Sequence, residues 1–271
     1  MQIQMVTFSA VKDGNAPSEW QDGACGGVAA DGRWGRFVVL DGATTAYDPV
    51  RWVDQLVRSL APPTGGAAGS PLPRLEPAAM RAWFAEMQDQ WAAEVRHFDS
   101  IIEERKFAEV GSFATLLGFD IYGLDGPEPY WRGVALGDTV LFHVRAGHLI
   151  ATFPPMGPDD FGTLPDGVHT SPASLDRMTE RLLTGGGVLE AGDFLFAATD
   201  AMAQWILRTI ERGEAKVWDT LTTLAHPGVF ARLVEDQRRE QDSAKRMKND
   251  DVTLMRLRML AGQPAYLLAC R

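Results

Sequence analysis

Residues 37–45 have the sequence FVVLDGATT, an apolar run that ends at Asp41 and passes into small residues. A short apolar run bounded by a turn signal is typical of a buried strand. Asp48 with Pro49 behind it is an N-cap followed by proline at the first helical position, so a helix is expected to start there. The pattern therefore places the Asp41 carboxylate at a rigid strand end, with small side chains around it.

A second segment repeats this arrangement. Residues 194–201, FLFAATDA, form another apolar run, and Asp200 follows it at the entry to a helix. Asp138 stands between two short strands, and Asp250 and Asp251 stand directly before the last strand. If these strands are neighbours in space, several carboxylates converge. An aspartate at a strand end is more often a cap or a turn residue, so residue types alone favour that interpretation over convergence.

The remaining segments indicate a layered α+β protein of one domain spanning residues 1–271. Strands are predicted at 2–10, 24–30, 34–41, 113–121, 130–137, 140–145, 148–153, 194–199 and 252–260, and the four from 113 to 153 look like a meander. Helices are predicted at 49–60, 78–104, 174–183, 202–212, 215–224 and 227–245. Two stretches rich in proline and glycine, 61–77 and 154–172, are expected to be exposed loops. Strands and helices come in blocks, which favours α+β over a βαβ fold.

Composition excludes several classes of protein. Of the 271 residues, 45% are apolar and 23% charged, as in an ordinary globular chain and unlike a disordered or collagen-like one. The 26 Lys and Arg against 36 Asp and Glu give a net charge of -10, which argues against nucleic acid or an anionic membrane as a partner. Cys25 and Cys270 indicate neither a disulfide framework nor a thiolate zinc site. We expect no export signal and no membrane span, and therefore a cytoplasmic protein.

The candidate aspartates also indicate a kind of chemistry. Converging carboxylates repel one another unless a cation neutralises them. Because the candidate ligand atoms are all oxygens, the cation indicated is Mg²⁺ or Mn²⁺ and not Zn²⁺. Two such ions polarise a phosphoryl group and activate water near neutral pH. Phosphoryl hydrolysis is therefore the expected chemistry if the aspartates meet.

The order of the acidic residues resembles that of the metal-dependent protein phosphatases, the type 2C serine/threonine phosphatases. The resemblance runs from near Asp22 to near Arg258 and consists of short motifs in family order. They are Gln21-Asp22, Val39-Leu40-Asp41-Gly42, Gly111-Ser112-Phe113-Ala114-Thr115, Gly137-Asp138-Thr139, Gly192-Asp193 with the strand to Thr199-Asp200-Ala201, and Asp250-Asp251-Val252-Thr253. No single motif is specific to the family, whereas their joint order is.

This resemblance implies an α-β-β-α sandwich, in which two antiparallel sheets are flanked by helices and a centre of two Mn²⁺ or Mg²⁺ ions lies at one end. It also implies that Asp41 bridges both ions and that the Gly42 carbonyl binds one of them. Asp200 and Asp250 complete the pair. Catalysis would then depend most on Asp41 and Asp200.

Two further acids are assigned by the same resemblance. Asp22 and Asp138 would bind through water or hold a third, weaker ion. A hydroxide bridging the ions would attack phosphoserine or phosphothreonine directly. The expected partners are a phosphoprotein substrate and a serine/threonine kinase or its targets.

The chain departs from the family pattern at three positions. Gln21 replaces an acid, Ala43 stands where some members have a histidine that protonates the leaving group, and Pro17 stands where many have a phosphate-binding arginine. Lys12 is a weak candidate to replace that arginine. The departures suggest a second interpretation, a phosphatase-like module that binds a phosphoprotein or a kinase with little or no turnover. The retained acids favour the enzyme, since uncompensated carboxylates cost stability.

Overall fold

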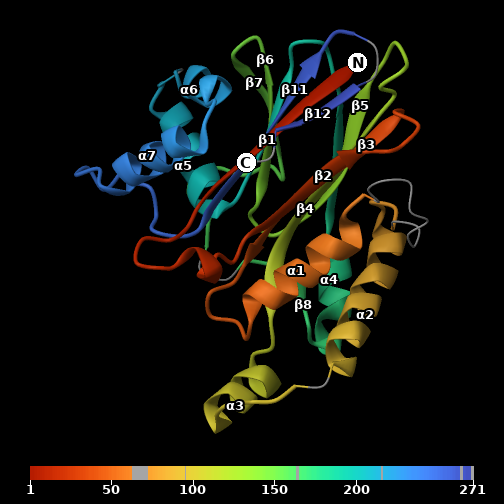
Figure 1. The fold of residues 1–271 in the computed structure, drawn as a ribbon, viewed down its shortest axis with the longest axis vertical. Helices are drawn as coiled ribbons and strands as arrows, with labels where there is room; N and C mark the ends of the chain where they lie inside the picture. The colour runs from red at the N-terminus through yellow and green to blue at the C-terminus, as the bar shows by residue number, and fades with distance from the viewer. Residues whose placement is uncertain (63–72, 95, 163–164, 215, 263–264, 270–271) are drawn as a thin grey trace.

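Two six-stranded sheets form the centre of the fold in a computed structural model, which describes residues 1–62, 73–94, 96–162, 165–214, 216–262 and 265–269 (Figure 1). In spatial order, the first sheet contains β12 (Ala265–Ala269), β1 (Gln2–Ala10), β11 (Val252–Leu260), β10 (Phe194–Ala198), β6 (Val140–Arg145) and β7 (His148–Phe153). The second contains β2 (Gly23–Val28), β3 (Trp34–Gly42), β4 (Phe113–Tyr122), β5 (Tyr130–Leu136) and β9 (Leu183–Val188), with β8 (Val168–His169) also paired to β4. Paired strands are antiparallel except β1 and β12.

Helices cover the outer face of each sheet. The helices α5 (Asp200–Glu211), α6 (Val217–Thr223) and α7 (Pro227–Arg238) lie on the first sheet, and α1 (Pro49–Leu60), α2 (Pro77–Ala93) and α4 (Leu175–Arg181) lie on the second (Figure 1). Three apolar cores result, one between the sheets around Phe37, Leu117 and Met255, one under α5–α7 around Phe196 and Ile206, and one under α1 and α2 around Trp52 and Phe84. The predicted α-β-β-α sandwich is therefore confirmed.

Local signals explain how α1 begins and packs. The Asp48 carboxylate accepts a hydrogen bond from the Arg51 N–H, and Pro49 occupies the first turn, where its missing N–H has no consequence. Trp52 and Leu56 point into the core under the second sheet and are fully buried. This packing fixes the course of the chain directly after Asp41.

The prediction of one helix over 78–104 is wrong. α2 ends at Ala93, and the Arg96 guanidinium turns back to donate to the Trp91 carbonyl at 2.5 Å. A new helix, α3 (Ile101–Glu109), begins where the Ser100 hydroxyl accepts a hydrogen bond from the Glu103 N–H at 3.2 Å. Side-chain hydrogen bonds to backbone groups therefore interrupt an apolar period that continues through the break.

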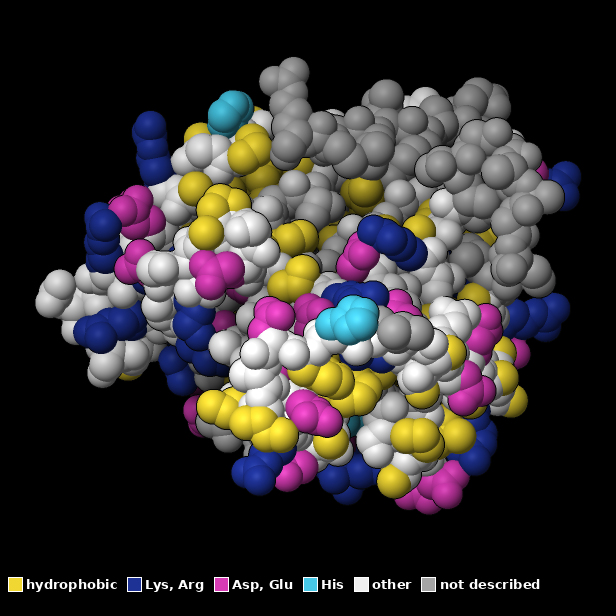
Figure 2. Space-filling view, turned by 60° about the horizontal axis from the view of Figure 1, so that its bottom comes forward, with side chains coloured by type: hydrophobic (Ala, Val, Ile, Leu, Met, Phe, Trp, Pro, Cys, Tyr) yellow, Lys and Arg dark blue, Asp and Glu magenta, His cyan; other side chains and the backbone are white. Residues whose placement is uncertain are grey.

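Helix α3 extends away from the sandwich (Figure 1). Its outer residues Ile101 and Ile102 are 64% and 76% exposed. Figure 2 shows this end of the molecule brought forward, with apolar side chains interspersed among acidic and basic ones. The face therefore has no single sign of charge among the residues described there.

The four strands from 113 to 153 are not one meander, although each is present. β4 and β5 belong to the second sheet and β6 and β7 to the first, so the chain crosses between sheets at the turn after β5. That crossing places the turn at the edge where the two sheets meet. It carries Asp138.

Three strands were not predicted, the two-residue β8 and the longer β9 and β12. β9 contains three consecutive glycines, and a Cβ at Gly186 would lie 2.8 Å from the Trp131 carbonyl oxygen, so close approach to β5 explains the composition. β12 pairs in parallel with β1 at the edge of the first sheet. Neither segment has the alternating β-formers that mark a strand in the sequence.

The predicted loops and the last helix also need correction. Most of 61–77, residues 63–72, lies outside the described residues. The stretch 154–172 is not entirely loop, because β8 pairs with β4 there and a short 3-10 helix starts at Pro172. The helix predicted over 227–245 ends at Arg238. Among the described residues, no helix is long and apolar enough to cross a bilayer.

Candidate functional site

Five aspartates meet at one end of the sandwich. Asp41 lies near the end of β3, and Asp22 lies directly before β2, both in the second sheet. Asp200 begins α5 behind β10, and Asp250 lies two residues before β11, both in the first sheet. Asp138 lies in the crossing from β5 to β6. Residues separated by more than two hundred positions are thereby brought to the gap between the two sheets.

Asp41, Asp138, Asp200 and Asp250 line one pocket of about 300 Å³. The rest of its wall is small or polar where β3 runs toward α1, and it includes Gly42, Ala43, Thr44, Thr45 and Thr115. This is the open space that the small residues after Asp41 predict. The pocket has room for a phosphoryl group.

Two glycines allow the strand ends to come this close. A Cβ on Gly42 would lie 2.5 Å from the Gln21 carbonyl oxygen, so only glycine lets β3 pack against the loop before β2. Gly137 has φ +108°, which an L side chain rarely adopts, and a Cβ there would lie 2.8 Å from Thr115. Both glycines therefore position the acid next to them.

The carboxylates are crowded and under-neutralised. Burial, and then the charges of Asp22, Asp200 and Asp138, raise the pKa of Asp41 well above its ordinary value. Burial and the nearby Asp200 raise the pKa of Asp138 to about 7. Among the described residues, buried Asp138 Oδ1 has no hydrogen-bond partner. A cation is the simplest remedy for such a cluster.

Asp22 is buried, at 4% exposed, and does not itself line the pocket. Its Oδ2 accepts hydrogen bonds from the Thr253 hydroxyl at 2.8 Å and the Thr199 hydroxyl at 3.1 Å, while its Oδ1 has no partner among the described residues. Burial raises the pKa of Asp22 well above its ordinary value, although the two hydroxyl hydrogen bonds act in the opposite direction. One oxygen of Asp22 is thus fixed by the first sheet and the other is unpaired.

Two lysines reach the pocket from opposite sides. Lys248 Nζ lies 2.6 Å from Asp200 Oδ2 and 2.8 Å from Asp250 Oδ2. Lys12 Nζ lies 3.6 Å from Asp250 Oδ1. Burial lowers the pKa of Lys248, but Asp200 and Asp250 outweigh burial and raise it above the ordinary value. The sequence interpretation missed Lys248, although a basic residue two positions before an acid pair was visible.

Asp251 organises the loop that carries Lys12 and Gln21. Its two carboxylate oxygens accept the Lys12 N–H at 2.7 Å and the Gln21 N–H at 2.8 Å. The Gln21 side-chain oxygen in turn accepts the Thr44 hydroxyl at 2.8 Å. Gln21 therefore contacts the rim of the pocket, whereas Pro17 lies in an exposed 3-10 helix and does not line it.

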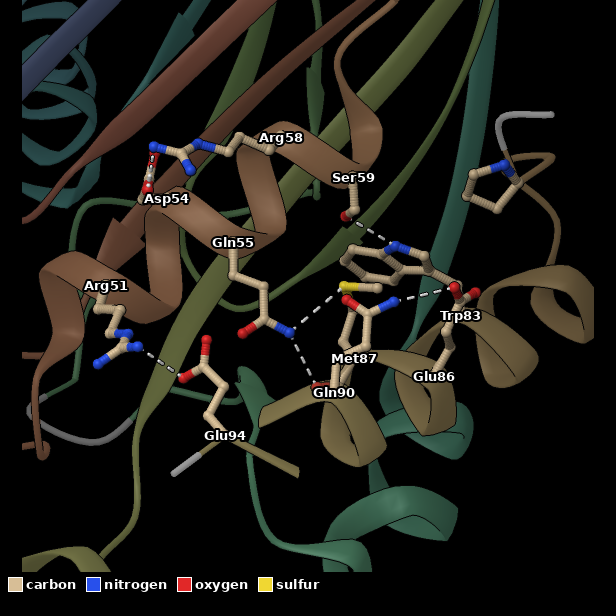
Figure 3. Close-up of a pocket in the computed structure, with 11 residues that line it drawn as sticks. Arg51, Asp54, Gln55, Arg58, Ser59, Trp83, Glu86, Met87, Gln90 and Glu94 are labelled. Carbon is tan, nitrogen blue, oxygen red and sulfur yellow. Dashed lines mark hydrogen bonds and ion pairs between the residues drawn. The ribbon is translucent and has the colours of Figure 1, made fainter. Parts of the chain in front are cut away.

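A larger pocket, of about 530 Å³, lies between α1 and α2 (Figure 3). Its polar side chains pair with one another: Arg51 with Glu94 at 3.1 Å, Arg58 with Asp54 at 2.7 Å, and the Trp83 indole with Ser59 at 3.0 Å. These groups leave little unmet charge. The smaller pocket, with its convergent acids, is therefore the better candidate for chemistry.

Comparison with known proteins gives matches in structure only. No protein-family model and no curated protein matches the sequence. The catalytic domain of the serine/threonine protein phosphatase PstP, solved with two manganese ions, superposes with a TM-score of 0.57 over 96% of this chain and 99% of that one, at 16% identity. PppA, a regulatory component of T6SS in Pseudomonas aeruginosa, gives 0.56 over 95% and 98%, also at 16% identity. The S. agalactiae serine/threonine phosphatase gives 0.55 over 95% and 99%, at 13% identity.

This chain has the type 2C phosphatase fold. At these identities the match shows the fold and not the activity. Among the described residues, no group of three or more His, Cys, Asp or Glu side chains is arranged to hold a metal ion as it lies. The donor chemistry of this pocket and its surroundings nevertheless fits a hard divalent cation, because among the described residues Asp22 and Asp138 each have a buried oxygen without a hydrogen-bond partner, and the pKa values of both are raised.

Proposed function

We propose that this chain is a metal-dependent phosphatase, folded as one domain, that hydrolyses phosphoserine and phosphothreonine in proteins. One observation carries the proposal: four carboxylates line one small pocket at the end of a type 2C fold with a fifth, Asp22, beside them, and among the described residues Asp22 and Asp138 each have a buried oxygen without a hydrogen-bond partner. The fold alone would support a phosphatase or a relative that has lost turnover. The retained and costly acid cluster favours the enzyme.

In this proposal Asp41, the Gly42 carbonyl, Asp200 and Asp250 hold two Mn²⁺ or Mg²⁺ ions. The carboxylates of Asp22 and Asp138 add further negative charge near these ions. Bound divalent ions supply Lewis acidity toward a phosphoryl group and lower the pKa of coordinated water.

The chain's own residues orient the substrate. Lys12 reaches the pocket from the loop that Asp251 fixes, and its ammonium is placed to pair with a phosphate oxygen. Ala43 and Thr44 line the pocket with small side chains, which leaves room for the backbone of a phosphorylated peptide. Because Ala43 has no proton to give, the leaving alkoxide takes its proton from water.

One observation favours a second candidate, a module that binds a phosphoprotein or a kinase without turnover. The Lys248 ammonium already pairs with Asp200 and Asp250, so these two carboxylates are partly neutralised without a metal ion. In that case the phosphate would meet Lys12 and Lys248 directly. The two candidates differ in whether phosphate is released.

The test is phosphate release from a phosphothreonine peptide by the purified chain in Mn²⁺, in Mg²⁺ and in excess EDTA. Release with either metal that disappears with EDTA is expected. Asp236→Ala, at an exposed acid of α7 that does not line the pocket, is the matched control and should release phosphate as wild type does. Peptide binding without release in every metal would favour the binding module.

A further inference from the structure

Lys248 occupies a position that a metal ion would need. Its ammonium bridges two carboxylates that arrive from different elements, Asp200 at the start of α5 and Asp250 ahead of β11. The contacts of 2.6 and 2.8 Å are full hydrogen-bonded ion pairs. Asp200, Asp250 and Lys248 all line the candidate pocket.

An ammonium at this distance from the two oxygens repels a divalent ion that binds them. Mg²⁺ and Mn²⁺ need carboxylate oxygens at about 2.0–2.2 Å, closer than the ammonium lies, and both cations are positive. The remaining Asp200 oxygen is engaged, since Oδ1 accepts the Ala201 N–H at 2.5 Å. A divalent ion held between Asp200 and Asp250 therefore requires that Lys248 leave.

The side chain is free to leave. It is 48% exposed, and among the described residues its ammonium contacts are these two carboxylates. Rotation toward water would break no apolar packing that the described contacts include. The state in which Lys248 contacts Asp200 and Asp250 and the state in which it extends into water therefore differ mainly by two ion pairs.

We propose that Lys248 is an internal competitor of the divalent ion, which binds between Asp200 and Asp250 only when the lysine ammonium swings out. This inference rests on the proposed function, because it concerns the same ion. Competition with the ammonium lowers the apparent affinity of the site for the metal ion. When metal is scarce, Lys248 neutralises part of the acid cluster, and when metal is abundant the ion displaces it. Lys248 is thus a positioning and regulatory residue that does not contact the substrate.

The variants that separate these states are Lys248→Met, which keeps the length and removes the charge, and Lys248→Arg, which keeps both the charge and a bridging geometry. Lys245→Met, an exposed lysine three positions earlier, is the matched control. Mn²⁺ binding is measured by titration calorimetry at fixed pH and ionic strength, a readout that does not depend on turnover. Lys248→Met is expected to bind Mn²⁺ at least about tenfold more tightly than wild type, because two charge-assisted hydrogen bonds no longer oppose binding. Lys248→Arg and Lys245→Met are expected to stay within about threefold of wild type, since neither loses those bonds.

Thermal unfolding supplies the second readout. In EDTA, Lys248→Met is expected to unfold at a lower temperature than wild type, because it leaves Asp200 and Asp250 without their cation. In saturating Mn²⁺ the difference is expected to disappear, because Lys248 of wild type then no longer contacts the two carboxylates either. A lysine with a merely structural role would lower the unfolding temperature in both conditions.

The outcomes separate this inference from the proposed function. Equal or weaker Mn²⁺ binding by Lys248→Met, with binding by wild type intact, overturns the competitor and leaves the phosphatase proposal standing. Binding by Lys248→Met alone supports the competitor and shows that wild type favours the binding module. Absence of binding by both proteins overturns both proposals.

Discussion

The Thr253 hydroxyl donates a hydrogen bond to Asp22 Oδ2 at 2.8 Å, which joins the first sheet to the second at the end of the sandwich where the aspartates meet. Thr253 is fully buried in β11, and Asp22 lies at the start of β2. The bond holds a buried carboxylate whose other oxygen has no partner among the described residues. Strand β11 therefore positions an acid that belongs to the opposite sheet.

Thr253→Val should weaken both the fold and the site. Valine keeps the shape but removes the donor, so the cost is expected to be about 1–3 kcal/mol of unfolding free energy. Mn²⁺ affinity should fall about tenfold or more, as for other residues that orient ligands. Urea unfolding and Mn²⁺ titration measure the two effects. The control is Thr209→Val, which removes a buried hydroxyl that donates to the Trp205 carbonyl at 2.7 Å, and it should lower stability without changing Mn²⁺ affinity.

Asp41→Asn should stabilise the metal-free protein while it impairs the site. Burial and the surrounding carboxylates raise the pKa of Asp41, so its ionised form is unfavourable without a cation. The amide removes that charge with little change of shape. In EDTA we expect a higher unfolding temperature for the variant, by about 2–4 °C for each kcal/mol gained. In Mn²⁺ the variant should gain less than wild type, and an equal gain would place Asp41 outside the metal site.

Local signals made much of the fold predictable. The cap formed by Asp48 and Pro49 needs only neighbouring residues and is present as expected. The break after Ala93 was missed because the apolar period continues across it, and the decisive contacts are made by Arg96 and Ser100.

The site was only partly predictable for a related reason. The strand ends that carry acids can be read from the sequence, and their order resembles that of a family. Which acids share a pocket depends on the crossing between the sheets at Asp138. The ion pairs of Lys248 depend on α5 and the segment before β11 meeting in space, which no local pattern contains.

Gln21→Glu should strengthen metal binding. The Gln21 side chain bonds the Thr44 hydroxyl at the pocket rim, so a carboxylate there adds negative charge near the ions without moving the backbone that Asp251 holds. The Mn²⁺ concentration at half-maximal binding should fall several-fold. Gln90→Glu, an exposed change on α2, is the matched control and should leave the titration unchanged. Superimposable curves for Gln21→Glu and wild type would show that residue 21 lies outside the field of the ions.

Asp193 should make stability depend on acid pH. Burial raises its pKa, but hydrogen bonds from Arg145, His143 and the Glu190 N–H outweigh burial and lower the pKa below the ordinary value. The contribution is therefore complete above the unfolded value of about 3.9 and is lost as the pH falls through the lower folded value. Asp193→Asn should lower the urea midpoint at pH 7, and the difference from wild type should shrink on acidification. If the difference in urea midpoint did not change with pH, the ionised form of Asp193 would not be the source of its stabilising effect on the fold.

Lys12→Ala should raise KM for a phosphopeptide more than it lowers kcat, because Lys12 lines the pocket and, in the proposed function, pairs with the phosphate in the ground state. The loss of one charge-assisted contact is worth about 1.5–3 kcal/mol when desolvated and less at this half-exposed position. Lys245→Ala serves as the control. A fall in kcat with KM unchanged would assign Lys12 a different role.

The central claim is that the acid cluster performs phosphoryl hydrolysis. The most direct test compares phosphate release from one phosphothreonine peptide by wild type and by Asp41→Ala, both at saturating Mn²⁺ and with Asp236→Ala as control. The account predicts release by wild type and the control, and a loss of several orders of magnitude in Asp41→Ala. Equal release by wild type and Asp41→Ala, or no release by wild type at any Mn²⁺ concentration, would contradict it.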